Sequence, residues 1–178
     1  MIIPVNLKFL RNASQFYGEK GPLPATEFSV GVDLRACFDD LNQTETTILP
    51  GERAKIGSGI AIEPLPCREQ NQMQTAAGAG GVAGTACAGG VAGFVYSRSG
   101  LGAKHGLVVA QGVGVIDPDY RGEIIVWLLN TSKNPLTIQQ GERMAQLVFL
   151  NYFQPAFNIV TELGDTQRGA GGFGHTGR

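Results

Sequence analysis

Short runs of β-branched and other apolar residues recur along this chain, and most are bounded by glycine or proline. Glycine, at 26 of 178 residues, is about twice as frequent as in an average protein. Strand-forming runs separated in this way are typical of an all-β barrel or sandwich. The expected strands lie within 2–10, 28–36, 46–50, 54–62, 94–97, 107–110, 124–129, 136–139 and 141–149.

Length and charge restrict the class of protein. A chain of 178 residues suits a single domain, 1–178, that buries its own core. The net charge of −1 and the isoelectric point near 6.1 argue against a broad nucleic-acid or membrane surface, so neither partner is expected. The three cysteines, Cys37, Cys67 and Cys87, form no Cys-x-x-Cys pair, so neither a disulfide framework nor a structural zinc site is expected. The start of the chain shows no signal-peptide pattern, and we expect a cytoplasmic protein.

One stretch departs from the pattern of short strands. Residues 76–93 contain seven glycines, seven alanines and no charge, and Ala-Gly-Gly-Val-Ala-Gly occurs at 79–84 and again at 88–93. Such a sequence is too weakly apolar for a transmembrane span and too rich in glycine for a packed helix. We expect a flexible surface loop, inserted at about 66–93 and lengthened by a short duplication.

The most informative stretch is 111–123, Gln-Gly-Val-Gly-Val-Ile-Asp-Pro-Asp-Tyr-Arg-Gly-Glu. It joins two apolar runs and predicts a β-hairpin with a tight turn at 117–122. Gly112 and Gly114 lie in the incoming strand, where glycine marks a bulge or the close approach of another group. Turn chemistry explains Asp117 as well as a functional role does, so these residues alone leave both interpretations open.

Further polar residues stand out among apolar neighbours. Asp33 interrupts a strand-like run and is either a solvent-exposed strand end or an oxygen ligand for a divalent cation or its waters. Ser99 is placed to cap a short helix through 101–104, where backbone N–H groups suit phosphate. Gln146 must find partners in the fold or in a ligand. The glycine-rich tail, 165–178, is expected to be mobile, as a disordered end or as a lid over a ligand.

Five segments occur together in a specific order. They are GVDLRA (31–36), SRSGL (97–101), GVIDPDYRG (114–122), GERMAQ (141–146) and RGAGGFGHTG (168–177). In these segments the chain resembles the trimeric dUTP pyrophosphatase (dUTPase) family, over nearly its whole length except about 66–90. The resemblance implies a jelly-roll-like β-barrel that forms a homotrimer. In such a trimer each active site gathers segments from three subunits, and the C-terminal tail is exchanged between subunits.

The resemblance also implies an activity and its residues. The expected reaction is Mg²⁺-dependent hydrolysis of dUTP to dUMP and pyrophosphate, which keeps uracil out of DNA and supplies dUMP for thymidylate synthesis. Asp117 is implied as the general base that deprotonates the attacking water, and Asp33 as the residue that holds the waters of Mg²⁺. Tyr120 is implied to lie against the deoxyribose and exclude a 2′-hydroxyl. The other implied positions are Arg98, Ser99, Gly100 and Gln146 on the phosphates, Gln111, Gly114, Val115, Ile116 and Ile125 around uracil, and Arg168, Phe173 and Thr176 in the tail.

Three residues depart from the family pattern, and, separately, two alternative functions stay open. Ser97 replaces a common proline, His175 stands where serine is frequent, and Gln111 is longer than the asparagine of some relatives. The related dCTP deaminases would need a catalytic glutamate at Trp127, and indole cannot act as a general base. A regulatory protein that binds a partner through 76–93 is the second alternative, although glycine and alanine offer no aromatic or arginine anchors.

Overall fold

The computed structural model describes residues 3–40, 42–65 and 89–172. Eleven strands and two short helices follow one another in this part of the chain. Their bounds are β1 Val5–Phe9, α1 Ser14–Tyr17, β2 Val32–Arg35, β3 Glu45–Ile48, β4 Arg53–Gly57, β5 Ile60–Pro64, β6 Gly89–Ser97, η1 Gly100–His105, β7 Leu107–Val109, β8 Gly114–Ile116, β9 Ile125–Asn130, β10 Leu136–Gln139 and β11 Arg143–Phe153. None of the helices described is long and apolar enough to cross a membrane.

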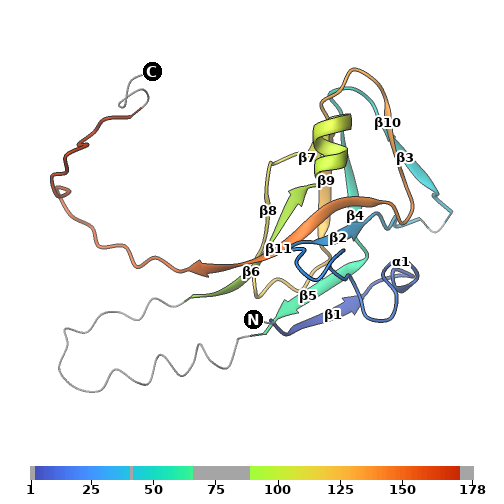
Figure 1. Cartoon of the computed structure of the whole chain (residues 1–178), viewed down its shortest axis with the longest axis horizontal. Coiled ribbons are helices and arrows are strands. Elements are labelled where there is room, and N and C mark those ends of the chain that lie inside the picture. The colour runs from blue at the N-terminus through green and yellow to red at the C-terminus, as the bar shows by residue number, and fades with distance from the viewer. Residues whose placement is uncertain (1–2, 41, 66–88, 173–178) are drawn as a thin grey trace.

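The strands form small antiparallel sheets around one core (Figure 1). The strand orders are β1-β5, β10-β3, β2-β11-β6-β8 and β4-β9-β7. Alternate side chains point inward, as β9 shows, where Val126 and Leu128 are fully buried and Trp127 between them is 45 % exposed. The prediction of an all-β, jelly-roll-like barrel is therefore confirmed. Its largest fully buried side chains include Leu34, Ile48, Ile56, Ile60, Leu107, Ile124, Leu128, Ile138, Met144 and Leu147.

The prediction of a hairpin around 111–123 is correct for its two paired strands but wrong for the segment that joins them. β7 does pair with β9, with Val109 opposite Leu128, but β8 leaves this sheet and pairs with β6 instead. Gly112 makes the departure possible, because its φ of +81° turns the chain where a side chain would be strained. The segment after β7 therefore crosses from one sheet to another, and the turn at Asp117, where Tyr120 N donates to Asp117 O at 3.1 Å, follows β8.

Two other predicted boundaries are also wrong. The run 54–62 is divided between β4 and β5, because Gly59 has a φ of +72° and the chain turns there. Residues 89–93, assigned to the inserted loop, belong to β6, where Gly93 pairs with Phe149 and Gly89 with Phe153. Backbone hydrogen bonds to the long strand β11 need no side chains, so a glycine-rich sequence suffices. The rest of the predicted insertion, 66–88, lies outside the described residues.

The last part of the described chain runs away from the barrel. Beyond β11 the chain leads outward and ends far from the core (Figure 1). Its side chains are exposed from 153 to 170, including the large apolar side chains of Phe157 and Ile159, at 90 % and 96 %. A segment with so many exposed apolar groups is incompletely packed within one chain.

Candidate active site

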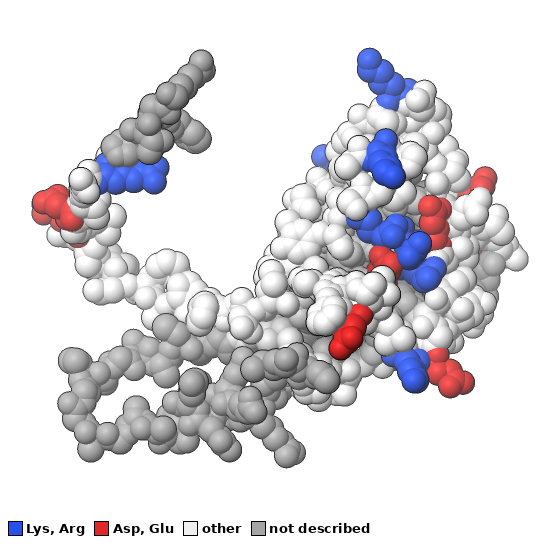
Figure 2. Space-filling model, in the orientation of Figure 1, with Lys and Arg blue, Asp and Glu red and all other residues white. Residues whose placement is uncertain are grey.

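A cluster of charged side chains joins β2, β6 and β11. Asp33, on β2, accepts a hydrogen bond from Arg98 Nε at 2.7 Å, and Arg143 Nη1 lies 3.4 Å from its other oxygen. Figure 2 shows basic side chains gathered with acidic ones on the face of the barrel crossed by β2 and β11. Two guanidinium groups face one carboxylate, so the cluster keeps a surplus positive charge that suits a phosphate group. Asp33 is thus a paired residue of the cluster, and its side chain is 27 % exposed.

Arg143 was not predicted as a site residue, although it lies in the segment 141–146. Simple alternation along a strand would place Arg143 and Gln146 on opposite faces, because they are three residues apart. A bulge in β11 changes this, since Arg143 pairs with Arg35 and Gln146 with Asp33. Both side chains therefore lie on the face of Asp33. The sequence signal of the bulge is the pair of consecutive apolar residues Met144 and Ala145, both of which are buried.

Gln146 has the partners that its polar character required. Its Nε2 donates to Ser97 O at 3.1 Å, and a Cβ at Gly31 would lie 3.1 Å from its Oε1. Ser97, at the position of the family's proline, also accepts a hydrogen bond from Val109 N through its hydroxyl, at 2.8 Å. The backbone around 97–100 is therefore tied both to β11 and to β7.

The helix after β6 differs from the predicted one. It spans Gly100–His105, and its i→i+5 hydrogen bonds make its turns wider than those of an α-helix. Ser99 occupies the residue before the helix but its side chain makes no capping hydrogen bond, so the predicted cap is wrong. Among the described residues, nothing lies within 4 Å of the place where a Cβ of Gly100 would be, so their packing does not require glycine there.

The segment 111–125 presents a second group of predicted residues. Asp117 and Tyr120 are exposed, and Val115 is 60 % exposed, whereas Gly114 and Ile116 are buried. A Cβ at Gly114 would lie 3.2 Å from Val95, so packing against β6 is itself a reason for this glycine.

Gln111 and Ile125 are the two ends of this segment. Gln111 lines an open cavity of about 560 Å³ together with Arg53, Ala110 and Trp127. Ile125 is half-buried at the start of β9.

The structure does not bring Asp117 together with the charged cluster. β8 runs antiparallel to β6, with Gly114 opposite Val95 and Ile116 opposite Gly93. Asp117 therefore continues towards the start of β6, whereas Arg98 follows its other end. The two positions are six residues apart along the strand, and this corresponds to a distance of roughly 20 Å. Within one chain the predicted site is divided into two halves.

The tail residues are only partly described. Arg168 Nε donates to Gly171 O at 2.9 Å, within the tail itself. Phe173, His175 and Thr176 lie outside the described residues. The predicted contacts of the tail therefore stay predictions.

The charged cluster offers one carboxylate to a cation. Among the described residues, no three His, Cys, Asp or Glu side chains lie together as a set of metal ligands. Asp33 retains free acceptor lone pairs beside its two arginines, since each carboxylate oxygen can accept more than one hydrogen bond. This arrangement fits a hydrated cation that is held mainly by substrate phosphates, and it does not fit an all-protein metal cage.

Comparison with known proteins places the chain among similar sequences and structures. Residues 70–177 match the family model described as dUTPase. Deoxyuridine 5'-triphosphate nucleotidohydrolases from Desulfitobacterium hafniense (strain DSM 10664 / DCB-2) and Acinetobacter baylyi (strain ATCC 33305 / BD413 / ADP1) are 44 % and 40 % identical to it. The first alignment covers 89 % of this chain and 87 % of the relative, and the second covers 92 % and 93 %. The Staphylococcus bacteriophage 80alpha dUTPase G164S mutant with dUpNHpp has a similar fold, with a TM-score of 0.71, 21 % identity, and coverage of 98 % and 99 %.

Proposed function

The chain belongs to the dUTPase family, and from this premise we propose how it hydrolyses dUTP to dUMP and pyrophosphate. The observation that carries the activity is the 44 % identity to a deoxyuridine 5'-triphosphate nucleotidohydrolase across 89 % of the chain. The enzyme is a dUTP diphosphatase, which keeps uracil out of DNA and supplies dUMP for thymidylate synthesis. We place it in the cytoplasm, because the odd number and the spacing of its cysteines predict no disulfide framework.

The charged cluster forms the phosphate half of the site. Arg98 and Gln146 are held by the fold, through Asp33 and Ser97 respectively, so their donors are oriented before the substrate arrives. Ser99 and Gly100 follow Arg98 and complete the surface for the triphosphate. Mg²⁺, when bound, would neutralise the charge of the triphosphate and of the leaving pyrophosphate. Asp33 would hold the waters of that ion.

Asp117 forms the chemical half of the site. Water at neutral pH is a poor nucleophile, and a carboxylate within hydrogen-bond reach can accept its proton during attack on the α-phosphorus. Asp117 is exposed at the end of β8, so it is accessible to a substrate that approaches from outside its own chain. Tyr120 follows three residues later and lies against the deoxyribose.

Uracil is bound by the segment that carries Asp117. Gln111, Gly114, Val115, Ile116 and Ile125 surround the base, and backbone groups of β8 pair with its edge. The 5-methyl group of thymine would clash there, and cytosine would present its donors and acceptors in reverse. In the tail, Arg168 and Thr176 hold the γ-phosphate and Phe173 covers the base and excludes water.

A homotrimer unites the two halves. Asp117 and Arg98 are roughly 20 Å apart along one sheet. The general base Asp117 of one copy therefore serves the phosphate half of another copy. The exposed apolar side chains of Phe153, Phe157 and Ile159 support exchange of the tail, since a neighbouring copy would bury them.

The function is tested by product analysis with Mg²⁺ and dUTP, dCTP, dTTP or UTP, each supplied separately. We expect dUMP and pyrophosphate from dUTP alone. The Asp117→Asn variant should lose turnover by about a hundredfold or more while it still binds the nucleotide, because the amide cannot accept the proton. Conversion of dCTP would show that Trp127 does not exclude deamination, and no reaction with any nucleotide would overturn the proposed function.

A further inference from the structure

The segment that carries Asp117 is fixed at its far end by a partly buried ion pair. Arg11 donates from Nη1 to Glu123 Oε2 at 2.9 Å and from Nη2 to Glu123 Oε1. The two side chains are 21 % and 13 % exposed. A guanidinium that meets both oxygens of a carboxylate is the strongest and most directional form of this pair. The hydrogen bond to Glu123 raises the pKa of Arg11, so the guanidinium stays charged.

The ion pair joins parts of the chain that are far apart in sequence. Glu123 also accepts a hydrogen bond from Gly59 N at 2.6 Å. Arg11 donates to Cys37 O at 3.1 Å and lies 2.9 Å from Asp39 Oδ1. Arg11 has a φ of +53°, and it is the only non-glycine residue with a positive φ in the described part of the chain. Such a conformation is unfavourable for a side chain and persists where several contacts hold it.

The contacts continue from Glu123 to the proposed site. Tyr120 donates from its hydroxyl to Glu123 O at 3.0 Å, and Tyr120 N donates to Asp117 O at 3.1 Å. A series of adjacent hydrogen bonds therefore connects Arg11 with the general base and with the residue that faces the sugar. A shift of Glu123 would move Tyr120 and the turn that begins at Asp117.

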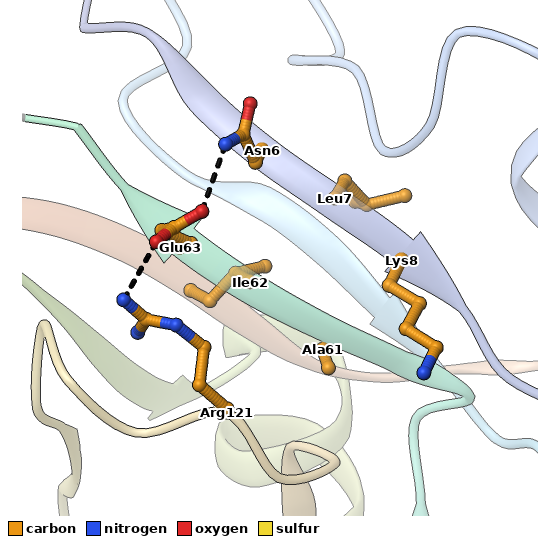
Figure 3. A pocket seen from close by; sticks show the side chains of 7 residues that line it. All are labelled: Asn6, Leu7, Lys8, Ala61, Ile62, Glu63 and Arg121. Carbon is orange, nitrogen blue, oxygen red and sulfur yellow. Dashed lines mark hydrogen bonds and ion pairs between the residues drawn. The ribbon is translucent and has the colours of Figure 1, made fainter.

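A second ion pair on the same segment provides a matched control. Arg121 Nη2 lies 2.7 Å from Glu63 Oε1, and Asn6 donates to the other oxygen of Glu63 at 2.8 Å (Figure 3). The side chains of Arg121 and Glu63 are 53 % and 38 % exposed. Exposed ion pairs contribute little, because water screens the charges and long side chains lose entropy. Loss of this ion pair should therefore have much less effect than loss of the partly buried pair of Arg11 and Glu123.

We propose that Arg11 and Glu123 are positioning residues for the hydrolysis, and that their ion pair sets the positions of Asp117 and Tyr120. The inference rests on the proposed function. The pair acts through the chemical half of the site and not through the phosphate half. Its loss therefore lowers kcat and the preference for dUTP over UTP, while the KM for dUTP changes less than kcat, because the contacts of the triphosphate with the phosphate half stay intact.

The test compares Glu123→Gln and Arg11→Lys with the control Glu63→Gln. Glu123→Gln keeps an acceptor for Gly59 N but removes the charge, and Arg11→Lys keeps the charge but removes the fork. We expect Glu123→Gln to lower kcat on dUTP by about tenfold to a hundredfold, with KM changed by less than about threefold. The ratio of kcat/KM for dUTP to that for UTP should fall by about tenfold, and Arg11→Lys should lie between this variant and the wild type. Glu63→Gln should stay within about twofold of the wild type in all three quantities.

Hydrogen–deuterium exchange of peptides that cover 117–123 gives a readout that does not depend on turnover. We expect faster exchange in Glu123→Gln than in the wild type, and no change in Glu63→Gln. Folded variants with wild-type kcat, selectivity and exchange would overturn the inference, and a lower melting temperature alone would not rescue it. If the wild type itself lacks activity, the proposed function fails and the exchange experiment alone decides the positioning inference. If Glu123→Gln does not fold, Arg11→Lys carries the same test.

Discussion

At the scale of single residues, Tyr17 connects two distant parts of the barrel through one phenolic oxygen. Its hydroxyl donates to Ser58 O at 2.9 Å and accepts a hydrogen bond from Arg35 N at 2.8 Å. The ring lies 6.2 Å from that of Phe9, centre to centre. Burial disfavours the phenolate and raises the pKa of Tyr17 to about 12.

This raised pKa predicts how stability falls at alkaline pH. The pKa in the folded state is above the unfolded value, so the stabilisation is complete below about pH 10 and is lost as the pH rises through about 12. The loss amounts to about 2–3 kcal/mol. In urea unfolding at stepped pH, Tyr17→Phe should be less stable than the wild type at pH 8 and should lose less stability between pH 10 and 12. Parallel profiles of the two proteins would contradict this role of Tyr17.

At the scale of elements, the break between β4 and β5 shapes the part of the barrel beside Glu123. Gly59, in this break, has a φ of +72° and donates from its backbone to Glu123. A Cβ at this position would overlap Ala13 and lie 2.8 Å from Cys37 Sγ. Both the backbone conformation and the packing therefore require glycine at this turn.

Gly59→Ala should lower the free energy of unfolding by about 2–4 kcal/mol, since strain at positive φ adds to overpacking. Gly51→Ala is the matched control, because Gly51 has a φ of +78° but no atom of the described part of the chain lies within 4 Å of a Cβ there. Its cost should be about 1 kcal/mol, from backbone strain alone. Urea denaturation of both variants at one protein concentration measures the difference. Equal losses would show that packing around residue 59 adapts to the methyl group.

Elements were predictable from sequence where side chains determine them. β10 was predicted at 136–139, which are its observed bounds. Elements were missed where the backbone determines them. The strand at 89–93 needs only a pairing partner, and the bulge in β11 shifts Arg143 onto the face of Asp33. Neither effect leaves a periodic pattern in the residue types.

At the scale of the whole molecule, the order of the five segments identified the family but did not show how they meet. Two of the residues that those segments contribute, Asp33 and Gln146, lie opposite each other on β2 and β11. Asp117 follows β8 and lies far from the charged cluster, because β8 pairs with β6 and not with β9. This exchange of sheets depends on long-range pairing, which local sequence does not specify. The separation of the two halves is the structural argument for the proposed sharing of the site between copies.

Subunit complementation tests the shared site directly. Asp117→Asn and Arg98→Ala each disable one half of the site, so each variant alone should be inactive on dUTP. When the two variants are unfolded, mixed in equal amounts and refolded, random assembly should restore roughly a quarter of wild-type activity, because each site needs one intact half from each variant. The same variants refolded separately and then combined without subunit exchange should stay inactive, which controls for residual turnover. If the mixed trimers are inactive while refolded wild type recovers, both halves must act within one chain, and the proposed sharing of the site would be wrong.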